Sequence, residues 1–486
     1  MARKLIRINK FGGGLSQFDR VSSTEGAFLR GTQLDYRTDP SSLSLNRDEV
    51  GTALPSTMNL ARWLVPAGLT TPSLFALDSG GYIKRRMANG TWVDFSSHAS
   101  SAGQGLGYWA GDDNLYFANY REIGRAGGLS STVSYNPGWK TGHTDSDYRP
   151  MKSFRDLLAI GSSRWLSTWD GTTFTASKLI FPAGWRVRSL ESWGEYLAIG
   201  CWRGHKVDAD ASGIIFFWDG ISTTYNFFVE TKGGVQAMKT VGSELYMLIG
   251  GHAELWKYNG SLSKVTNFPG VRIFGDSVDI NPGAVIERDG MLAIGAANGA
   301  STASFATGIY SYGSNNPAIP ETFNHEFTGN SSAAYDNTTA NQIGALAYLN
   351  DIMFFSTYNP VNTTVPVVVE IDGNSPFVTT RGGRYESLII NDDEPHRIKK
   401  AMKFVANFSP ITSGVTLEFI YRADGGAWTS IGTANTVGDV EYESTRDPLP
   451  FDFREVQLGV IFNQATADPQ PKLYSLILEF ESEVPL

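Results

Sequence analysis

The sequence predicts an all-β chain in which a β-propeller of about seven blades is followed by a β-sandwich. Two observations predict this fold class. A degenerate module returns along most of the chain: an apolar strand ending in small residues, then a strand that closes on an aromatic residue followed by Asp-Gly or Asn-Gly. Beyond residue 397, apolar and polar residues alternate in several short runs. Repetition at a spacing of roughly 40 to 60 residues is typical of propeller blades, and alternation is typical of half-buried strands.

The module is clearest at four places in the middle of the chain. It reads LLAIG and STWDG (157–161, 167–171), YLAIG and FFWDG (196–200, 216–220), YMLIG and WKYNG (246–250, 256–260), and MLAIG and GIYSYG (291–295, 308–313). Asp-Gly and Asn-Gly supply the positive φ angles of a type I′ hairpin turn. Each such pair is therefore expected to end one strand and begin the next.

Weaker copies of the module extend the repeat in both directions. They lie at 73–92, at 114–125 and at 351–373, which brings the expected count to seven blades and leaves six or eight open. The predicted domains are an N-terminal arm with a ring-closing strand at 1–50, a β-propeller at 51–390, and a jelly-roll-like β-sandwich at 391–486.

The N-terminal segment combines a glycine-rich lead, FGGGLSQFD at 11–19, with an alternating strand around Leu43 and Leu45. In a circular propeller a strand of this kind can pair into the last blade, which removes an exposed sheet edge. We expect the strand around Leu43 and Leu45 to close the ring in this way.

The C-terminal segment contains runs in which every second residue is apolar. The residues that share a face are Met402, Phe404, Ala406 and Phe408; Val415, Leu417, Phe419 and Tyr421; Val456, Leu458, Val460 and Phe462; and Tyr474, Leu476, Leu478 and Phe480. Antiparallel strands that are apolar on one face bury that face against a second sheet. The pattern predicts a β-sandwich.

Composition and charge exclude several classes of protein. The net charge of −9 argues against specific nucleic-acid binding, which needs clustered cations. No apolar run approaches the ~20 residues of a membrane span, and the basic N-terminus is not followed by the apolar core of a secretory signal. A single cysteine, Cys201, rules out an intrachain disulfide, and its place after an apolar strand predicts a small buried side chain.

The sequence predicts no enzyme and no cofactor. It contains no nucleophile elbow, phosphate-binding loop, zinc-binding HExxH or CxxC pair. Paired carboxylates from distant blades, of the kind that hydrolyse glycosides, stay an open alternative.

One segment resembles the start of a calcium loop. Asp208, Asp210 and Ser212 alternate, and Asp219 stands where a last ligand would be. Calcium needs 6–8 oxygen ligands, yet the second half of this segment is apolar and Asp219 is already explained as a turn residue. An acidic turn is therefore favoured over a metal site. The segment HTDSD, with His143, Asp145 and Asp147, is likewise favoured as a solvated loop.

Other features have a structural or an interaction interpretation. The tryptophans beside the blade hairpins are expected to pack in the core, while Arg186 and Arg188 are candidates to line a groove.

Two long polar stretches, 126–150 and 297–345, interrupt the repeat, and we expect them to form contacts between subunits.

The chain resembles β-propeller structural proteins of tailed bacteriophages, in particular tail hub or nozzle proteins. The resemblance rests on the repeats, on Phe11 to Asp19, on Gln33 to Pro40, and on the strand pattern after Arg397. It implies a homo-oligomeric component of the virion tail, a ring of about six copies whose inner face borders the DNA exit path. The implied partners are further copies of itself and neighbouring tail, portal-adaptor or fibre proteins, and the protein would be made in the host cytoplasm. An acidic lumen would repel DNA and let it pass.

Two other functions use the same scaffold. A receptor-binding or fibre-anchoring tail protein would recognise host surface glycans through the C-terminal sandwich. A propeller hydrolase acting on polysaccharide would place two carboxylates across the propeller mouth.

Overall fold

The computed structural model describes residues 3–16, 19–20, 25–46, 50–53, 60–97, 103–127, 129, 134–141, 148–204, 212–269, 278–298, 307–314, 320–327, 342–358, 367–371, 382–464 and 470–482. Within these ranges every helix or strand is a β-strand, which confirms the all-β class. The described ranges accordingly hold no helix that could cross a membrane.

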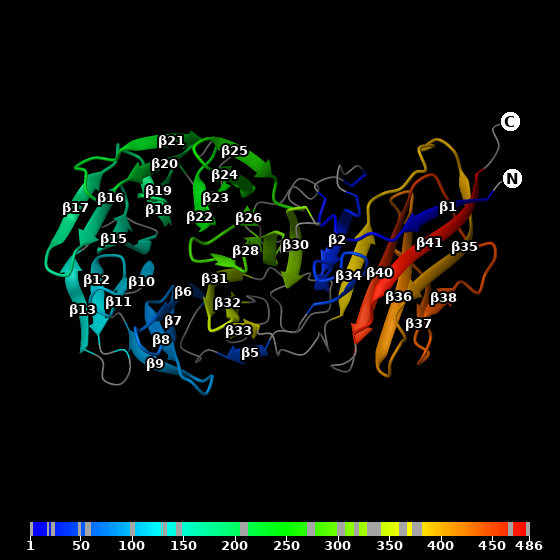
Figure 1. The fold of residues 1–486 in the computed structure, drawn as a ribbon, viewed down its shortest axis with the longest axis horizontal. Coiled ribbons are helices and arrows are strands. Elements are labelled where there is room, and N and C mark those ends of the chain that lie inside the picture. Colours follow the sequence, from blue (N-terminus) through cyan, green and yellow to red (C-terminus); the bar gives the residue numbers. More distant parts are fainter. Residues whose placement is uncertain are drawn as a thin grey trace. The chain divides into compact units, whose positions relative to one another are not determined.

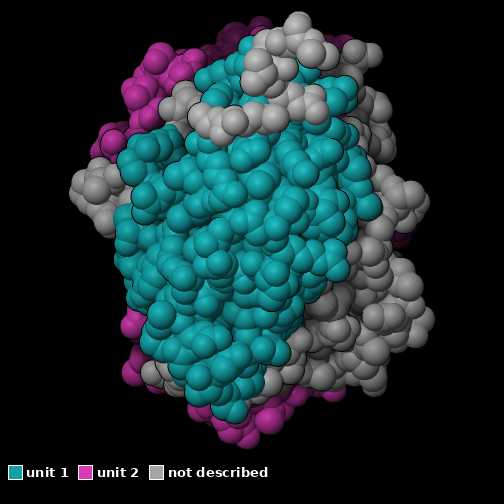
Figure 2. Space-filling view, turned by 90° about the vertical axis from the view of Figure 1, so that its right-hand side faces the viewer, with its two compact units in different colours: residues 1–49, 310–337, 374–486 teal, residues 50–309, 338–373 magenta. Residues whose placement is uncertain are grey.

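The chain divides into two compact units, which Figure 2 shows in teal and magenta. Unit 1 comprises residues 1–49, 310–337 and 374–486, and unit 2 comprises residues 50–309 and 338–373. Strand β29 (Gly308–Gly313) spans a boundary between them. The two units are described separately below.

Unit 2 is built from small antiparallel sheets in which consecutive strands pair (Figure 1). The first five sheets are β6 (Ala61–Ala67), β7 (Ser73–Asp78), β8 (Tyr82–Arg86) and β9 (Trp92–Ser97); β10 (Gly105–Trp109), β11 (Asn114–Ala118), β12 (Glu122–Gly127) and β13 (Ser134–Thr141); β14 (Met151–Phe154), β15 (Leu157–Ser162), β16 (Trp165–Trp169) and β17 (Phe174–Ile180); β18 (Arg186–Trp193), β19 (Tyr196–Arg203), β20 (Ser212–Trp218) and β21 (Phe227–Thr231); and β22 (Val235–Val241), β23 (Glu244–Ile249), β24 (Glu254–Tyr258) and β25 (Leu262–Thr266).

Two further groups of strands complete unit 2. In one, β26 (Val278–Asp279) and β27 (Val285–Arg288) both pair with β28 (Met291–Asn298). The other is a four-stranded sheet of β31 (Gln342–Leu349), β32 (Ile352–Tyr358), β33 (Val367–Ile371) and β5 (Val50–Ala53).

The first strands of these groups contact one another in a closed sequence. β6 contacts β10, and the contacts continue through β14, β18, β22, β27 and β31, which returns to β6. Figure 1 shows the sheets following one another around a circle in chain order. The apolar second strands, such as β15 and β19, are buried because each lies between its own sheet neighbours and an adjacent sheet.

The expected hairpin turns are only partly correct. Gly171 and Gly220 have the positive φ angles of 92° and 84°, but Asp170 and Asp219 do not. The carboxylate of Asp170 accepts the backbone N–H groups of Thr172 and Thr173, which holds the aspartate at ordinary φ in an Asx turn. These turns are therefore not type I′.

Two-residue turns with positive φ at both residues occur instead between first and second strands. Asp289 and Gly290 have φ angles of 53° and 76° between the paired residues Arg288 and Met291. A type I′ turn requires this combination of angles.

The strand that completes the last sheet of unit 2 comes from the N-terminal region, but it is not the expected one. β5 pairs with β33, with Thr52 opposite Val368. The strand that holds Leu45 is β4 (Ser44–Leu45), which pairs with β3 (Leu34–Asp35) in unit 1. Leu43 and Leu45 are fully buried in the core of unit 1, so their burial there removes them from the sheet of β33.

Unit 1 contains two larger sheets. One consists of β1 (Arg3–Ile8), β41 (Leu473–Ser482), β35 (Lys399–Phe408), β38 (Glu441–Glu443) and β39 (Asp452–Phe453). The other includes β30 (Thr322–Phe327), β2 (Phe28–Thr32), β34 (Gly383–Ser387), β40 (Val456–Gln464), β36 (Val415–Ala423) and β37 (Thr429–Ala434). The second sheet is mixed because β2 pairs in parallel with β30.

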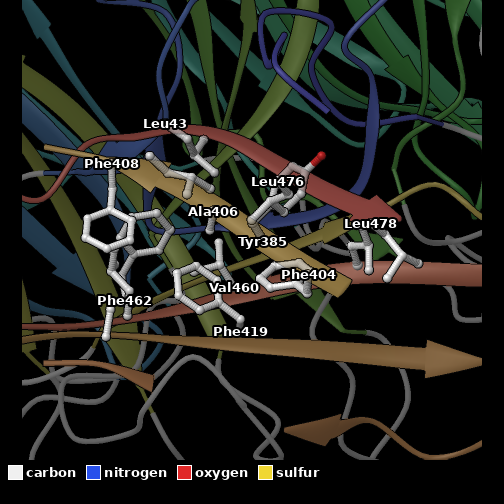
Figure 3. Packing of buried hydrophobic residues seen from close by; sticks show 14 of the residues in the cluster. Leu43, Tyr385, Phe404, Ala406, Phe408, Phe419, Val460, Phe462, Leu476 and Leu478 are labelled. Carbon is white, nitrogen blue, oxygen red and sulfur yellow. The ribbon is translucent and has the colours of Figure 1, made fainter. Parts of the chain in front are cut away.

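The two sheets of unit 1 share one hydrophobic core. The rings of Phe404 on β35 and Phe419 on β36 lie 5.4 Å apart between centroids. Figure 3 shows these rings together with side chains of β40 and β41, including Val460 and Leu478, in one packed layer. The predicted core face is buried on β35, β36 and β41 except at Tyr421, which is half-buried, and at Tyr474, which is 42% exposed. A register shift between Asn407 and Phe408 places Leu473 inside instead. On β40 the alternation is not observed, because Gln457, Gly459 and Ile461 are buried as well.

Candidate functional site

The centre of the circle of sheets in unit 2 contains polar side chains that irregularities in the first strands redirect. β6, β18 and β22 each have a register shift at one residue: Arg62, Arg188 and Gln236. A β-bulge leaves one residue without a partner and turns its side chain away from the regular alternation. Arg188 and Gln236 are completely or almost completely buried as a result.

Arg188 is a fully buried charged residue of this centre. Its guanidinium lies 4.5 Å from the ring centroid of Tyr148 and 4.2 Å from that of Trp202. Nε donates to the carbonyl of Gln236 at 2.9 Å, and Nη2 donates to the carbonyl of Ile280 at 3.0 Å. The side chain therefore joins β18 to β22 and to the segment after β26.

Gln236 uses both ends of its amide in the same region. Nε2 donates to the carbonyls of Gly250 and Val278 at 2.6 and 3.0 Å, and Oε1 accepts the N–H of Ile280 at 2.7 Å. These bonds connect Gln236 on β22 to the residue after β23 and to the segment around β26.

A hydrogen bond crosses the middle of the circle. The Tyr148 hydroxyl, just before β14, donates to Oδ1 of Asn281 at 3.2 Å, and Asn281 Nδ2 donates to the carbonyl of Ile343 on β31. β14 and β27 are not neighbours in the circle, since β18 and β22 lie between them. Side chains from non-neighbouring parts of the circle therefore meet at this level.

Arg149 adds a second buried guanidinium directly after Tyr148. It is fully buried, and its Nη2 donates to the carbonyl of Tyr120 at 2.8 Å. Burial lowers the pKa of Arg149 to about 10, so the group remains protonated at neutral pH. The centre of unit 2 thus carries positive charge in a desolvated environment.

A row of charges crosses three neighbouring first strands. Glu191 on β18 accepts from Lys152 on β14 at 2.8 Å and from Lys239 on β22 at 3.4 Å. The Glu191 side chain is only 9% exposed, so the two lysines compensate a carboxylate that is almost buried. This arrangement fastens adjacent sheets.

The calcium candidate is described only in part. Asp208 and Asp210 lie outside the described residues, and Ser212 begins β20 opposite Arg203. The carboxylate of Asp219 accepts the N–H groups of Ile221 and Ser222 and the side chains of Ser222 and Asn226 at 2.7–3.0 Å. These bonds hold the pKa of Asp219 well below its usual range. Asp219 thus acts as the anchor of its turn.

No group of three or more His, Cys, Asp or Glu side chains suitable for a metal ion occurs in the described part of the chain. His143, Asp145 and Asp147 lie outside that part, as do parts of the long stretches 126–150 and 297–345. Cys201 is fully buried as expected, and burial raises the pKa of its thiol. A protonated thiol in the core is not a nucleophile.

The sequence singled out one residue of this centre and missed the others. Arg188 was a candidate to line a groove, but it lies fully buried between aromatic rings. Gln236, Arg149 and Asn281 carried a signal that could have found them: a polar residue beside the apolar start of a blade, as in Val235-Gln236-Ala237. No protein-family profile matches this chain, and no curated protein matches it in sequence.

Proposed function

We propose that this chain is a non-enzymatic structural protein of a bacteriophage tail, in which unit 2 is a seven-bladed β-propeller and unit 1 contains a β-sandwich. The closed sequence of contacts from β6 to β31 and back to β6 supports the propeller. The shared core of the two sheets in unit 1 supports the sandwich.

The assembly role is supported by the side chains that bond to one another and to the backbone at the centre of unit 2. An active site needs a concave pocket with a few polar groups that converge on the substrate. Here the Tyr148 hydroxyl donates to the Asn281 side chain, and the bonds donated by Asn281 and Arg188 end on backbone carbonyls. A scaffold whose centre is used for its own stability offers its outer surfaces to partners.

The resemblance to tail hub and nozzle proteins specifies the assembly. The protein forms a ring of about six copies that borders the DNA exit path and contacts neighbouring tail, portal-adaptor or fibre proteins. The net charge of −9 is suited to a path that DNA passes without binding.

The mass of the purified full chain tests this proposal. We expect native mass spectrometry and light scattering to find a closed ring near six times the protomer mass of 53.0 kDa. A monomer at every concentration, including in mixtures with purified tail proteins of the same phage, would contradict a ring. Release of reducing ends from host polysaccharide by the same preparation would contradict the non-enzymatic assignment.

Receptor binding through unit 1 is the second candidate, and an exposed apolar group favours it. Val437, Val440 and Tyr474 are 66%, 52% and 42% exposed. Val440 and Tyr474 both lie near the end of β35, because Phe408 donates its N–H to Val440 and pairs with Leu473. A contiguous exposed apolar patch is typical of an interaction surface. Binding of the full chain to a host glycan array, lost in Tyr474→Ala, would support this candidate.

A further inference from the structure

Strand β1 is held to unit 1 by few buried side chains. In the described strand order it stands at one end of its sheet and pairs with β41. Ile6 is buried and Ile8 is half-buried, whereas Leu5 is 60% exposed. A strand at the end of a sheet can leave without displacing another strand, and so small a buried apolar area gives little resistance to its departure.

Two cations of β1 add ion pairs to its backbone pairing. Arg3 lies 3.5–3.8 Å from three carboxylates, and Lys4 lies 2.8–3.5 Å from two others. The carboxylates are those of Asp447, Glu479 and Glu481 for Arg3, and of Asp392 and Glu394 for Lys4. We call these five residues, together with the backbone of β41, the acceptor surface.

The ion pairs of the acceptor surface are reversible contacts. Their side chains are 26–49% exposed, so salt screens them. Arg397 pairs with Glu394 as well, at 3.0 Å, so β1 supplies part of the counter-charge of this surface. Backbone register and two positioned cations, and only a small apolar contact, therefore specify where β1 binds.

The link between β1 and the rest of unit 1 is short and exposed. Asn9 and Lys10 are exposed, and Phe11 behind them is fully buried in the core. Lys10 pairs with Glu25 at 2.7 Å, so this link is held by the N-terminal region and not by β41. The eight residues 3–10 span about 26–29 Å when extended, so β1 can reach an adjacent molecule while Phe11 keeps its place.

We propose that β1 is exchanged between copies of this chain, so that β1 of one molecule pairs with β41 of its neighbour. Within a single chain β1 occupies its own acceptor surface. A second copy is the partner that fits, because it carries the same strand and places Ile6, Arg3 and Lys4 in the same register. The inference rests on the proposed ring, which brings a neighbour within reach.

Exchange joins the copies through contacts that each chain already makes. In a closed ring every copy gives β1 to the next, and every acceptor surface is occupied. An open row of copies would leave one acceptor surface empty. Exchange of β1 therefore favours closure of the ring.

Disulfide trapping in the full chain tests the exchange. Arg7 on β1 and Ile477 on β41 lie directly opposite each other, and neither belongs to the acceptor carboxylates or their two cations. Directly opposite side chains are close enough for a disulfide. After oxidation of the assembled double variant Arg7→Cys/Ile477→Cys, denaturing electrophoresis without reductant is expected to show covalent multimers of the 53.0 kDa chain.

Native mass spectrometry of the same sample separates the two ways in which this experiment can fail. A ring of about six copies, each closed by an internal disulfide, would overturn the exchange and leave the ring standing. A monomeric chain would overturn both proposals. The single variant Ile477→Cys is the control, and it should give no covalent multimers with Cys201, which is fully buried.

Dissociation of the ring by salt keeps the proposal testable if the introduced cysteines do not pair. Lys4→Glu places a like charge beside Asp392 and is expected to shift dissociation to lower NaCl concentration. Lys10→Glu is the matched control, because the partner of Lys10 is Glu25, which lies outside the acceptor surface. This variant should keep the wild-type salt dependence. Identical dissociation curves for Lys4→Glu and Lys10→Glu would overturn the exchange.

Discussion

The Tyr148 hydroxyl donates a 3.2 Å hydrogen bond to Oδ1 of Asn281, a residue 133 positions later in the chain. This bond connects the segment before β14 with the segment before β27. These two strands are not neighbours in the circle of unit 2. Sheet ladders hold each sheet together, but side chains such as these hold the circle together across its middle. The stability of unit 2 should therefore depend on a few polar residues at its centre.

Tyr148→Phe is expected to lower the free energy of unfolding by about 1 kcal/mol, because it removes the hydrogen bond to the half-buried amide oxygen of Asn281. Urea unfolding monitored by tryptophan fluorescence measures the change. Tyr120→Phe is the control, since the Tyr120 side chain is 43% exposed. Equal stability of the two variants would show that the cross-circle bond contributes nothing.

Gln236→Leu should be more severe. It removes three hydrogen bonds and leaves two carbonyls and one N–H without their side-chain partner. The expected loss is about 3 kcal/mol, against about 1 kcal/mol for Thr240→Val, which removes a single bond on the same strand. The Thr240 hydroxyl donates to the carbonyl of Ser192. Similar unfolding midpoints for both variants would contradict the central role of Gln236.

Asp219→Ala should show a pH-dependent effect. The pKa of Asp219 is lowered in the folded protein by hydrogen bonds from Ser222, Asn226 and Ile221. A carboxylate with a lowered folded-state pKa stabilises the fold above its unfolded pKa of about 3.9, and this contribution is lost as the pH falls below that value. The difference in unfolding midpoint between wild type and variant should therefore shrink from pH 7 to pH 3. A difference that stays constant or grows toward low pH would disagree with the turn interaction.

Much of the fold could be predicted because strong local patterns encode it. The apolar strand LLAIG became β15, and the alternation of Phe404, Ala406 and Phe408 correctly identified the buried face of β35. Local patterns fail where one extra residue changes the register. Tyr474 was expected inside, but the register shift in the β35–β41 pairing brings Leu473 to the core.

The centre of unit 2 could not be predicted in the same way. Arg188 lies among alternating residues that suggest an exposed position, and only the bulge on β18 explains its burial. Its acceptors belong to residues 48 and 92 positions away. A single sequence offers no pattern for contacts over such separations, because they depend on the order in which sheets meet around the circle.

The pairing of β5 with β33 predicts a difference between two adjacent proline variants. Gly51 lies opposite Val369 and Thr52 opposite Val368. In an antiparallel pair, neighbouring residues alternate between directing their N–H to the partner strand and away from it. Proline removes that N–H, so only one of Gly51→Pro and Thr52→Pro should break the ladder, while the other is tolerated on an outer strand. Hydrogen exchange is expected to show faster exchange in β33 for one variant and wild-type protection for the other. Wild-type protection in both would mean that β5 does not complete this sheet, and the circle would then be closed by side-chain packing alone.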